Sequence, residues 1–373
     1  MTDCLMEGNE AVAWGAMAAG CRFFAGYPIT PATSIFNTML KLLPPAGGIV
    51  LQGEDEIASI GYCLGASMAG LKAMTATSGP GISLYSEHIS FAVGSEIPIV
   101  IVDVQRLGPS TGSATRGADG DVQFLRWGSS GGLPVIVLAP VDAQDCFSLT
   151  VRAFNLAEQY RCPVFLASNK EVGLTRETIA PAALAAPPVV DRRAPATSEG
   201  FLPFRPPPDR PIPDFLPIGG DTLVRQTSST HGSDGYITTD AAEIGRMRIR
   251  LKEKLLREVS HFSYHDLYPD PEADTLLITY GVTARAARAC VNLRHRHKKR
   301  VALLVLKTLW PVPADLIRSQ AAPFRRIVVP EMNLGQYGRE IERILPGKTV
   351  DGFGQMDGRL ITPEQIEEVF IHG

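Results

Sequence analysis

Short apolar runs and longer amphipathic stretches alternate along the first half of the chain. Five of these runs are short and bounded by Gly or Pro, and most contain Val or Ile, a pattern that predicts buried parallel strands. They cover residues 48–51, 72–77, 98–104, 133–138 and 163–167. The intervening segments are long enough for helices, as in 142–159. This alternation predicts an α/β fold with an open parallel sheet, and such sheets bind ligands at the carboxyl ends of their strands.

The pattern changes near Pro181. Prolines crowd the stretch 187–217, which predicts an extended linker and not a packed element. Apolar residues then recur at helical spacing at Ile244, Met247, Leu251, Leu255 and Val259. Arg and Lys lie between them, so we expect a packing helix with a solvated basic face.

Strand patterns resume at 275–281, 300–306 and 326–330, with a helix rich in Ala and Arg after the first. They predict a second, smaller α/β domain. We therefore expect three units: a first domain over 1–185, a Pro-rich linker and helical bridge over 186–268, and a second domain over 269–373. The basic run at 294–300 is interpreted as a solvated helix end, with an anion or nucleic-acid patch as the alternative.

Composition narrows the class of protein. The 373 residues are 45% hydrophobic and 20% charged, as in soluble folded chains, which excludes wholesale disorder, collagen and coiled coil. A net charge of −3 gives no indication of nucleic-acid binding. The first residues resemble no signal peptide, and no run approaches the ~18 apolar residues of a membrane span. We expect a cytoplasmic protein.

The cysteines predict no metal site. Six of them are scattered along the chain without a C-x-x-C pair. Neither a disulfide framework nor an iron–sulfur or zinc site can be inferred from this spacing. We interpret them as small buried thiols.

The first candidate site is the segment 26–34, Gly-Tyr-Pro-Ile-Thr-Pro-Ala-Thr-Ser. Two prolines restrict its backbone, while Thr30, Thr33 and Ser34 supply hydroxyl groups. Thr33 or Ser34 could cap a helix that begins at Ile35. Capping accounts for one hydroxyl only, so a ligand role for Thr30 stays open beside it.

The second candidate follows the strand at 48–51, where Glu54, Asp55 and Glu56 begin a helix. The helix dipole alone can explain carboxylates at this position. The helix is otherwise small and apolar, and Gly61 and Gly65 predict that it is buried and closely packed on one side. Glu56 begins the apolar stretch, so we expect it to be desolvated and able to exchange a proton near neutrality.

Two further loops carry candidate chemistry. The glycine turn at 76–81 follows a strand but lacks both the phosphate-loop and the dinucleotide patterns, so it indicates little by itself. Arg106 directly follows the strand at 98–104, in a glycine-containing loop. Arginine pairs well with a substrate carboxylate. A structural salt bridge to a nearby Asp is the alternative.

Taken together, these segments resemble the alpha subunit of 2-oxoacid:ferredoxin oxidoreductases, most closely the 2-oxoglutarate:ferredoxin oxidoreductase (2-oxoglutarate synthase) group. The resemblance extends from about residue 7 to about residue 345. It is carried by several motifs in the same order, at 8–11, 19–31, 77–81, 104–112, 308–313 and 330–336.

The resemblance implies a fold and a cofactor. The first domain would be a pyrimidine-type thiamine diphosphate-binding domain, and the second a transketolase C-terminal-like domain. Thiamine diphosphate would lie between this chain and a separate beta subunit. By motif match, Glu56 would hydrogen-bond the aminopyrimidine ring as the catalytic acid, with Glu54 as the fallback. Cofactor-binding residues would be Tyr27, Pro28, Ile29, Glu56, Ser78 and Gly79, and substrate-binding residues Thr30, Arg106, Ser110 and Thr111.

The implied reaction is oxidative decarboxylation of a 2-oxoacid with coenzyme A, which yields an acyl-CoA, carbon dioxide and reduced ferredoxin. The cysteine spacing leaves no place for the [4Fe–4S] cluster, and the diphosphate-and-Mg²⁺ motif is missing. Both therefore imply an obligate beta subunit, in an α2β2 heterotetramer. Residues 113–117 and 230–234 depart from the family pattern, so pyruvate, branched-chain or aryl 2-oxoacids remain alternatives to 2-oxoglutarate. A non-catalytic structural subunit is the alternative of another class.

Overall fold

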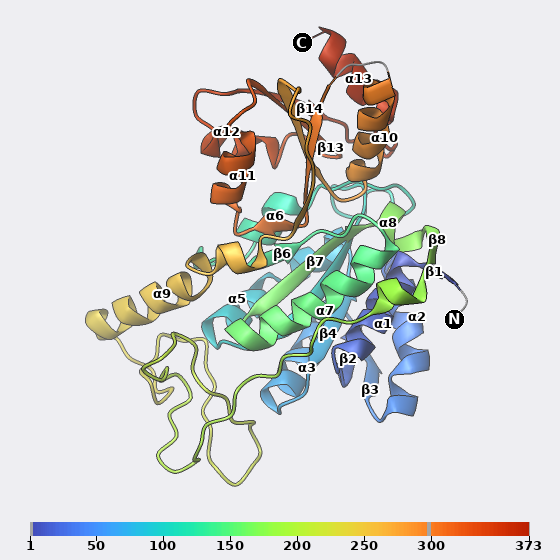
Figure 1. Ribbon diagram of the computed structural model, residues 1–373. Coiled ribbons are helices and arrows are strands. Elements are labelled where there is room, and N and C mark those ends of the chain that lie inside the picture. The colour runs from blue at the N-terminus through green and yellow to red at the C-terminus, as the bar shows by residue number, and fades with distance from the viewer. Residues whose placement is uncertain (1–2, 297–299, 373) are drawn as a thin grey trace.

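The computed structural model describes residues 3–296 and 300–372, and it contains two α/β layers stacked end to end (Figure 1). The larger layer is built on a seven-stranded sheet. Its strands, in spatial order, are β12 (Thr308–Trp310), β6 (Ile136–Leu138), β7 (Pro163–Asn169), β5 (Ile99–Gln105), β4 (Ala73–Thr77), β2 (Phe23–Gly26) and β3 (Ile49–Gln52). All neighbours are parallel except β12 and β6.

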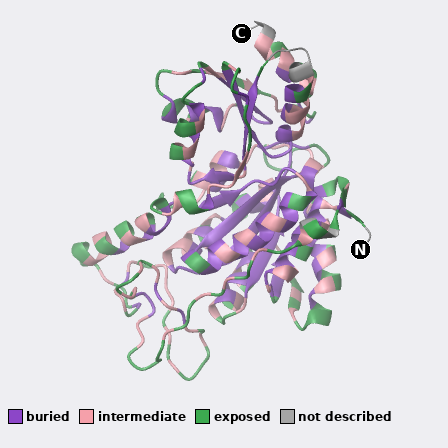
Figure 2. Ribbon diagram, viewed as in Figure 1, coloured by how far each residue is buried: buried purple, intermediate pink, exposed green. Residues whose placement is uncertain are grey.

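Helices cover both faces of this sheet, because its strands are apolar on both sides. The first face is covered by α1 (Gly8–Ala18), α2 (Thr33–Leu42) and α7 (Ala143–Tyr160). The second is covered by α3 (Glu56–Met68), α4 (Gly79–Leu84), α5 (Ser86–Gly94) and α6 (Val122–Trp127). Figure 2 shows the sheet as a continuous buried layer between these helices.

The smaller layer is a five-stranded sheet. Its order is β14 (Thr349–Gly354), β13 (Arg326–Glu331), β10 (Thr275–Tyr280), β11 (Ala302–Leu306) and β9 (His265–Tyr268), with only β9 antiparallel. One face packs against α10 (Thr283–Arg296) and α13 (Pro363–His372), and the other against α11 (Ala314–Ala321) and α12 (Gly338–Ile344). A separate antiparallel pair joins β1 (Cys4–Glu7) to β8 (Arg176–Ile179), which α8 (Lys170–Leu174) precedes.

The predicted α/β class is confirmed, and each predicted strand run forms a strand. The sequence did not predict β1, β2, β8, β9, β12 or β14. One prediction about burial is wrong: β3 is an edge strand, so Ile49 is 48% exposed and Leu51 40% exposed. The basic run at 294–300 lies partly outside the described residues.

The Pro-rich segment contains no helix or strand from residue 185 to residue 240, but it is packed, contrary to the prediction. The buried guanidinium of Arg161 donates to the carbonyl oxygens of Pro203, Pro213 and Asp214. Phe215 is buried beside it. Buried arginine therefore supplies the donors that this strandless backbone would otherwise lack.

Helix α9 (Ala241–Leu256) follows the Pro-rich segment, and buried charges hold it against the larger layer. Glu96 is fully buried and accepts from Arg250 at 2.6 Å and from Lys254 at 2.9 Å. The predicted helix is therefore present, although its polar side is partly buried. Its first turn is capped by Asp240, which accepts from the Glu243 amide.

One local prediction for the first domain is wrong, and another is correct only in part. Helix α2 begins at Thr33, and neither Thr33 nor Ser34 caps it. Helix α3 is buried on one side as predicted, through residues such as Ile60 and Leu64, but the glycines lie on the other side: a Cβ at Gly65 would meet nothing within 4 Å, and one at Gly61 only the His88 side chain. Ile57 and Tyr62 on the same side are 44% and 46% exposed. This helix therefore presents an apolar stripe to the surface.

Candidate active site

The sheet topology creates a crevice for a ligand. The chain runs from β2 to β3 on one side and then crosses to β4 on the other side of β2. In open α/β sheets such a reversal opens a crevice at the carboxyl ends of the strands. The segments that emerge there carry Thr30 after β2, Glu56 after β3 and Ser78 after β4.

The loop after β2 is held by a buried asparagine. Asn9 is fully buried, and its Nδ2 donates to the carbonyl oxygen of Pro31 at 2.9 Å and to Ser34 Oγ at 2.8 Å. Tyr27, Pro28 and Thr30 remain exposed, and Ile29 is half-buried. Asn9 thus fixes the inner end of the loop and leaves its outer end open to a ligand.

The three carboxylates after β3 have different surroundings. Glu54 is exposed, while Asp55 caps α3 by accepting from the Ala58 amide at 2.7 Å. Glu56 is only 8% exposed, which confirms the prediction that it is the buried one. No hydrogen bond or ion pair to its carboxylate occurs within the part of the chain that the structure describes.

The glycine turn after β4 makes room for Glu56. A Cβ at Gly81 would overlap Thr77 Oγ1 and lie 2.7 Å from Glu56 Cγ. Thr77 Oγ1 and Ser78 Oγ are both buried without a hydrogen-bond partner. Buried hydroxyl groups normally find one. Together with the Glu56 carboxylate, they form a polar wall suited to a ligand that carries both donors and acceptors.

Arg106 connects the ends of β5 and β2. Its side chain is 6% exposed, and Nη1 donates to the carbonyl oxygen of Thr30 at 2.6 Å. Its Nε is buried without a partner. Among residues 3–296 and 300–372, no carboxylate lies within ion-pair distance of this guanidinium. The structural salt bridge considered from the sequence is therefore not formed, and the buried cation keeps donors for an anionic ligand.

Buried carboxyl groups lie next to Arg106. Asp103 lies near the carboxyl end of β5 and is fully buried. The carboxyl groups of Asp103 and Asp121 are within hydrogen-bonding distance of each other. Burial and the charge of Asp121 raise the pKa of Asp103 well above its usual range. Burial raises the pKa of Asp121 to about 6, and that of Asp119 to about 7.

The smaller layer holds the loop that carries these groups. Asn333 donates to the Asp119 carbonyl oxygen at 2.9 Å, and Gln336 donates to that of Gly120 at 2.6 Å. The Asp119 amide in turn donates to Met332. This is the structural role of the segment 330–336. The sequence named the segment as a motif, but its contact with Asp119 could not be inferred from local pattern.

Not every predicted residue converges on this site. Ser110 and Thr111 lie at the exposed tip of the loop after Arg106. The loop is closed by hydrogen bonds between Leu107 and both Ser113 and Arg116. Among the described residues, neither Ser110 nor Thr111 hydrogen-bonds Thr30, Arg106 or Glu56. Reasoning from the sequence placed Gly81 and Asp121 in candidate loops, at 76–81 and 117–121, but gave neither residue a role in the site.

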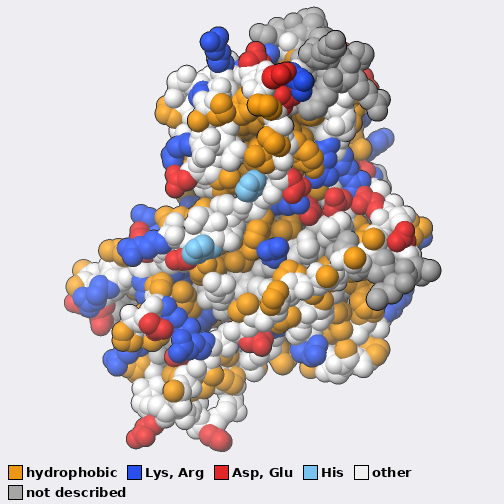
Figure 3. Space-filling view, in the orientation of Figure 1, with side chains coloured by type: hydrophobic (Ala, Val, Ile, Leu, Met, Phe, Trp, Pro, Cys, Tyr) orange, Lys and Arg blue, Asp and Glu red, His pale blue; other side chains and the backbone are white. Residues whose placement is uncertain are grey.

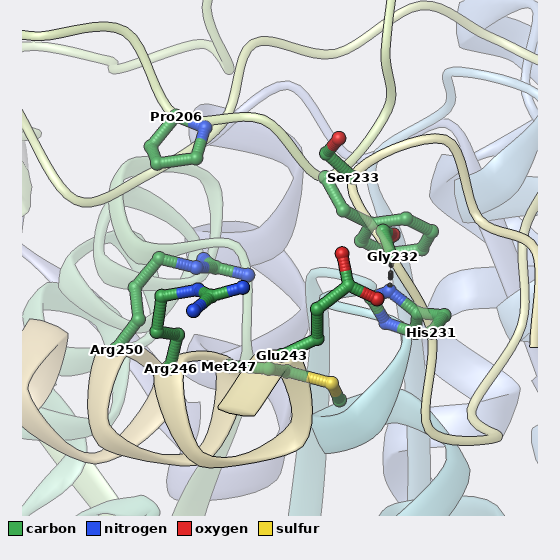
Figure 4. A pocket seen from close by; sticks show the side chains of 9 residues that line it. Pro206, His231, Gly232, Ser233, Glu243, Arg246, Met247 and Arg250 are labelled. Carbon is green, nitrogen blue, oxygen red and sulfur yellow. Dashed lines mark hydrogen bonds between the residues drawn. The ribbon is translucent and has the colours of Figure 1, made fainter. Parts of the chain in front are cut away.

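One cavity of the structure lies away from the predicted site. It has a volume of about 360 Å³ and lies between the Pro-rich segment and α9, and none of the predicted site residues lines it. Figure 4 shows Arg246, Arg250 and Glu243 pointing into it, with Ser233 and Pro206 at its edge. Figure 3 shows Lys and Arg side chains gathered on this side of the molecule. Arg250 is already paired with Glu96.

The family of the chain follows from its match to known sequences. Residues 14–251 match the model of the pyruvate flavodoxin/ferredoxin oxidoreductase, thiamine diphosphate-binding domain. The chain belongs to this oxidoreductase family. Residues 273–366 match a second model, the pyruvate:ferredoxin oxidoreductase core domain II.

Relatives of this oxidoreductase cover nearly its whole length. The 2-oxoglutarate synthase subunit KorA of Methanothermobacter thermautotrophicus is 40% identical over 98% of this chain and 97% of its own. The solved 2-oxoglutarate:ferredoxin oxidoreductase of Magnetococcus marinus, with 2-oxoglutarate, coenzyme A and succinyl-CoA bound, is 34% identical with a TM-score of 0.94. The match covers 99% of this chain but 65% of that longer one.

A distant neighbour bears on the fold alone. A split-gene transketolase is 11% identical with a TM-score of 0.57 over 98% of this chain. These comparisons confirm the predicted pairing of a thiamine diphosphate-type domain with a transketolase-like one.

The described residues contain neither a metal-binding cluster nor a membrane-spanning helix. Among the described residues of this oxidoreductase, no group of three or more His, Cys, Asp or Glu side chains is arranged to hold a metal ion. No described helix is both long and apolar enough to cross a membrane.

Proposed function

We propose that the chain is the alpha-type subunit of a 2-oxoacid:ferredoxin oxidoreductase that converts 2-oxoglutarate and coenzyme A to succinyl-CoA and carbon dioxide while reducing ferredoxin. One observation carries the proposal. A buried carboxylate without a protein partner, Glu56, and a buried guanidinium without a counter-ion, Arg106, follow the carboxyl ends of strands in the same sheet and interact electrostatically, in a chain of this family. The 40% identity to 2-oxoglutarate synthase subunits supports 2-oxoglutarate as the substrate.

The residues of the crevice fit the pyrimidine end of thiamine diphosphate. Glu56 would accept a hydrogen bond from the ring, and the unpaired hydroxyl of Ser78 would supply another contact. Gly79, Tyr27, Pro28 and Ile29 would line the ring. Because Gly81 has no Cβ, the Glu56 side chain has room to extend toward the ring. When bound, the cofactor supplies the electron sink that makes decarboxylation feasible.

Glu56 would hydrogen-bond the ring while shielded from water. Its burial removes competing solvent, so the hydrogen bond to the ring is stronger than in water. Thr30 and Arg106 would hold the substrate. The Arg106 guanidinium would pair with a substrate carboxylate, and the hydroxyl of Thr30 would orient it. Ser110 and Thr111 would complete this wall from their exposed loop.

The remaining parts would come from a beta subunit. We propose that the beta subunit supplies the diphosphate-and-Mg²⁺ site and the [4Fe–4S] cluster, that ferredoxin is the electron acceptor and that the assembly is α2β2. The exposed apolar stripe of α3, with Ile57, Gly61, Tyr62 and Gly65, supports a partner beside Glu56. An apolar surface of this kind typically marks an interface.

We propose that the domain division is 1–185, 186–268 and 269–373. The sheets do not follow these limits strictly, since β9, which precedes residue 269, joins the second sheet and β12, which follows it, joins the first. The expected cytoplasmic location remains a prediction.

The test is an assay of the chain purified with its beta subunit. Reduction of a viologen dye would be followed with a panel of 2-oxoacids plus coenzyme A. We expect the highest kcat/KM with 2-oxoglutarate and no turnover by the isolated chain. Reduction with pyruvate, a branched-chain or an aryl 2-oxoacid but none with 2-oxoglutarate would overturn the substrate. Turnover without a beta subunit would overturn the partner.

A further inference from the structure

The contact between Asp103 and Asp121 is unusual for a buried pair of acids. Asp103 is fully buried in the middle of the sheet, and neither of its oxygens receives a hydrogen bond from any described donor. Asp121 Oδ2 is likewise buried and unpaired. Two carboxylates at hydrogen-bonding distance cannot both be ionised without a large cost. A proton shared between them removes the repulsion and supplies the missing donor.

The surroundings of the pair bring this charge close to Arg106. The amide of Asp121 donates to Gln105 Oε1 at 2.9 Å, which places Asp121 against the end of β5. A Cβ at Gly79 would lie 3.3 Å from Asp121 Oδ2, so the carboxyl also borders the turn after β4. Asp121 and Glu56 are the two acids that interact with the Arg106 charge.

Other charged groups face the pair from the neighbouring elements. Asp119, on the same loop as Asp121, interacts with Asp103, Asp121 and Glu331 of β13. Asn169 Nδ2 donates to Asp119 Oδ1 at 2.7 Å, so one oxygen of Asp119 is satisfied. Arg106 is the only cation that interacts with the pair among the described residues. When the pair loses its proton, the added negative charge therefore acts mainly on Arg106.

We propose that Asp103 and Asp121 share a proton, and that this proton keeps Arg106 available to the substrate carboxylate. Asp103 is thus a positioning residue for the substrate and acts through Asp121. While the proton is present, the pair carries one negative charge, and Arg106 retains attraction for an anionic ligand. Once the proton is lost, the second negative charge of the pair attracts the Arg106 guanidinium and competes with the substrate carboxylate for it. The inference rests on the proposed function, because it takes Arg106 as the substrate-binding cation.

Asp103→Asn tests the inference in the assembled αβ enzyme. The amide can donate to Asp121 as the shared proton does, but it cannot titrate. We expect the wild-type KM for the 2-oxoacid to rise with pH, by about tenfold per pH unit beyond the apparent pKa of the pair. In D103N this rise should disappear. The KM for coenzyme A should depend on pH in the same way in wild type and in D103N. Asp121→Asn should flatten the same profile, and it serves if D103N fails to fold.

A matched control is Asp145→Asn. Asp145 is also a buried acid whose pKa is raised by burial, but it pairs with Lys307 at the far end of the sheet. The D145N enzyme should keep the wild-type rise in KM. Infrared spectroscopy gives a readout without turnover. At a pH above the pKa of Asp119, which is about 7, that acid is ionised; the carbonyl band of a protonated carboxyl should then remain in wild type and D145N and be lost in D103N.

The outcomes separate the two levels of the argument. If none of the 2-oxoacids supports dye reduction by the wild-type enzyme, the proposed function fails, and this inference fails with it. If the wild type turns over but D103N keeps the wild-type rise in KM, or if the wild type lacks the protonated-carboxyl band, only the inference fails.

Discussion

Arg106 Nη1 donates a 2.6 Å hydrogen bond to the carbonyl oxygen of Thr30, and this bond joins two strand ends that lie 76 residues apart in the chain. It fixes a buried guanidinium at the crevice and leaves Nε unpaired. The structural Arg161 spreads its donors over several backbone carbonyl oxygens, whereas Arg106 has one such bond in the described residues. The arrangement is therefore better suited to binding an anion than to holding the fold together.

Arg106→Lys should weaken substrate binding more than it weakens the fold. Lysine keeps the charge but loses the planar fork that can bond Thr30 and a carboxylate together. Loss of one hydrogen bond to a charged group corresponds to about 1.5–3 kcal/mol. We expect the KM for the 2-oxoacid to rise about 10- to 100-fold in steady-state assays of the αβ enzyme. Arg116→Lys, on the exposed part of the same loop, is the control and should leave KM unchanged. An unchanged KM in R106K would assign Arg106 a structural role only.

Glu56→Gln should lower kcat by about 10²- to 10⁴-fold, the range for loss of a positioned acid or base. The variant keeps the size of the side chain, so the chain should still assemble with its partner, as size-exclusion chromatography would show. Glu54→Gln is the control, since Glu54 is exposed two residues earlier. Full turnover by E56Q and by Glu56→Ala would support a non-catalytic subunit.

Gly81→Ala should reduce cofactor affinity and kcat. The new Cβ would overlap Thr77 Oγ1 and press on Glu56 Cγ, so the carboxylate must shift. The measurement is the thiamine diphosphate concentration needed for half-maximal activity. Gly245→Ala is the control, because a Cβ there meets nothing within 4 Å on α9. That change should raise the free energy of unfolding by about 0.5–1 kcal/mol and leave the cofactor requirement as it is. Equal cofactor requirements in both variants would argue against the Gly81 contact.

Asp119→Asn should change how stability depends on pH. Burial raises the pKa of Asp119 to about 7 from an ordinary value of 3.8. A raised pKa means that the folded state holds the proton more tightly, so this group stabilises the fold below about pH 4 and loses that contribution as pH rises to about 7. Asparagine keeps the acceptor for Asn169 and cannot ionise.

We therefore expect the Tm of D119N to fall less than that of wild type as pH rises between these values. The corresponding difference in the free energy of unfolding is about 1.4 kcal/mol for each unit of pKa shift. Thermal denaturation in a series of buffers measures this. Parallel Tm curves for the two proteins would contradict the prediction.

Asn333→Ala should loosen the loop that carries Asp119 and Asp121. The change removes the bond to the buried Asp119 carbonyl oxygen and the acceptor of the Gln336 amide, while Tyr280 Oη keeps its bond to Glu331. Each unsatisfied buried group costs about 1–3 kcal/mol. We expect a lower Tm and a higher KM for the 2-oxoacid. Gln355→Ala, which removes an exposed bond to Arg359, is the control. A lower Tm with an unchanged KM would limit Asn333 to a structural role.

Local sequence pattern was sufficient for several of these features. Apolar runs located β3, β4 and β5, three of the strands that carry the site, but not β2, and the first apolar position of α3 indicated that Glu56 is buried. These are properties of a residue and its near neighbours, which determine strand and helix formation through side-chain periodicity. The same reasoning failed where burial depends on a neighbouring element. It took β3 for a buried strand and the Gly61–Gly65 face for a packed one.

What the sequence by itself determined is the α/β class, the order of the main strands and the identity of Glu56 and Arg106 as candidate residues. Only the tertiary structure decided that Asp103 faces Asp121, that Asn333 holds a loop 214 residues earlier in the chain, and that Arg106 has no ion-pair partner among the described residues. Side-chain periodicity is a local property, whereas the environment of a buried charge depends on which distant segments pack around it.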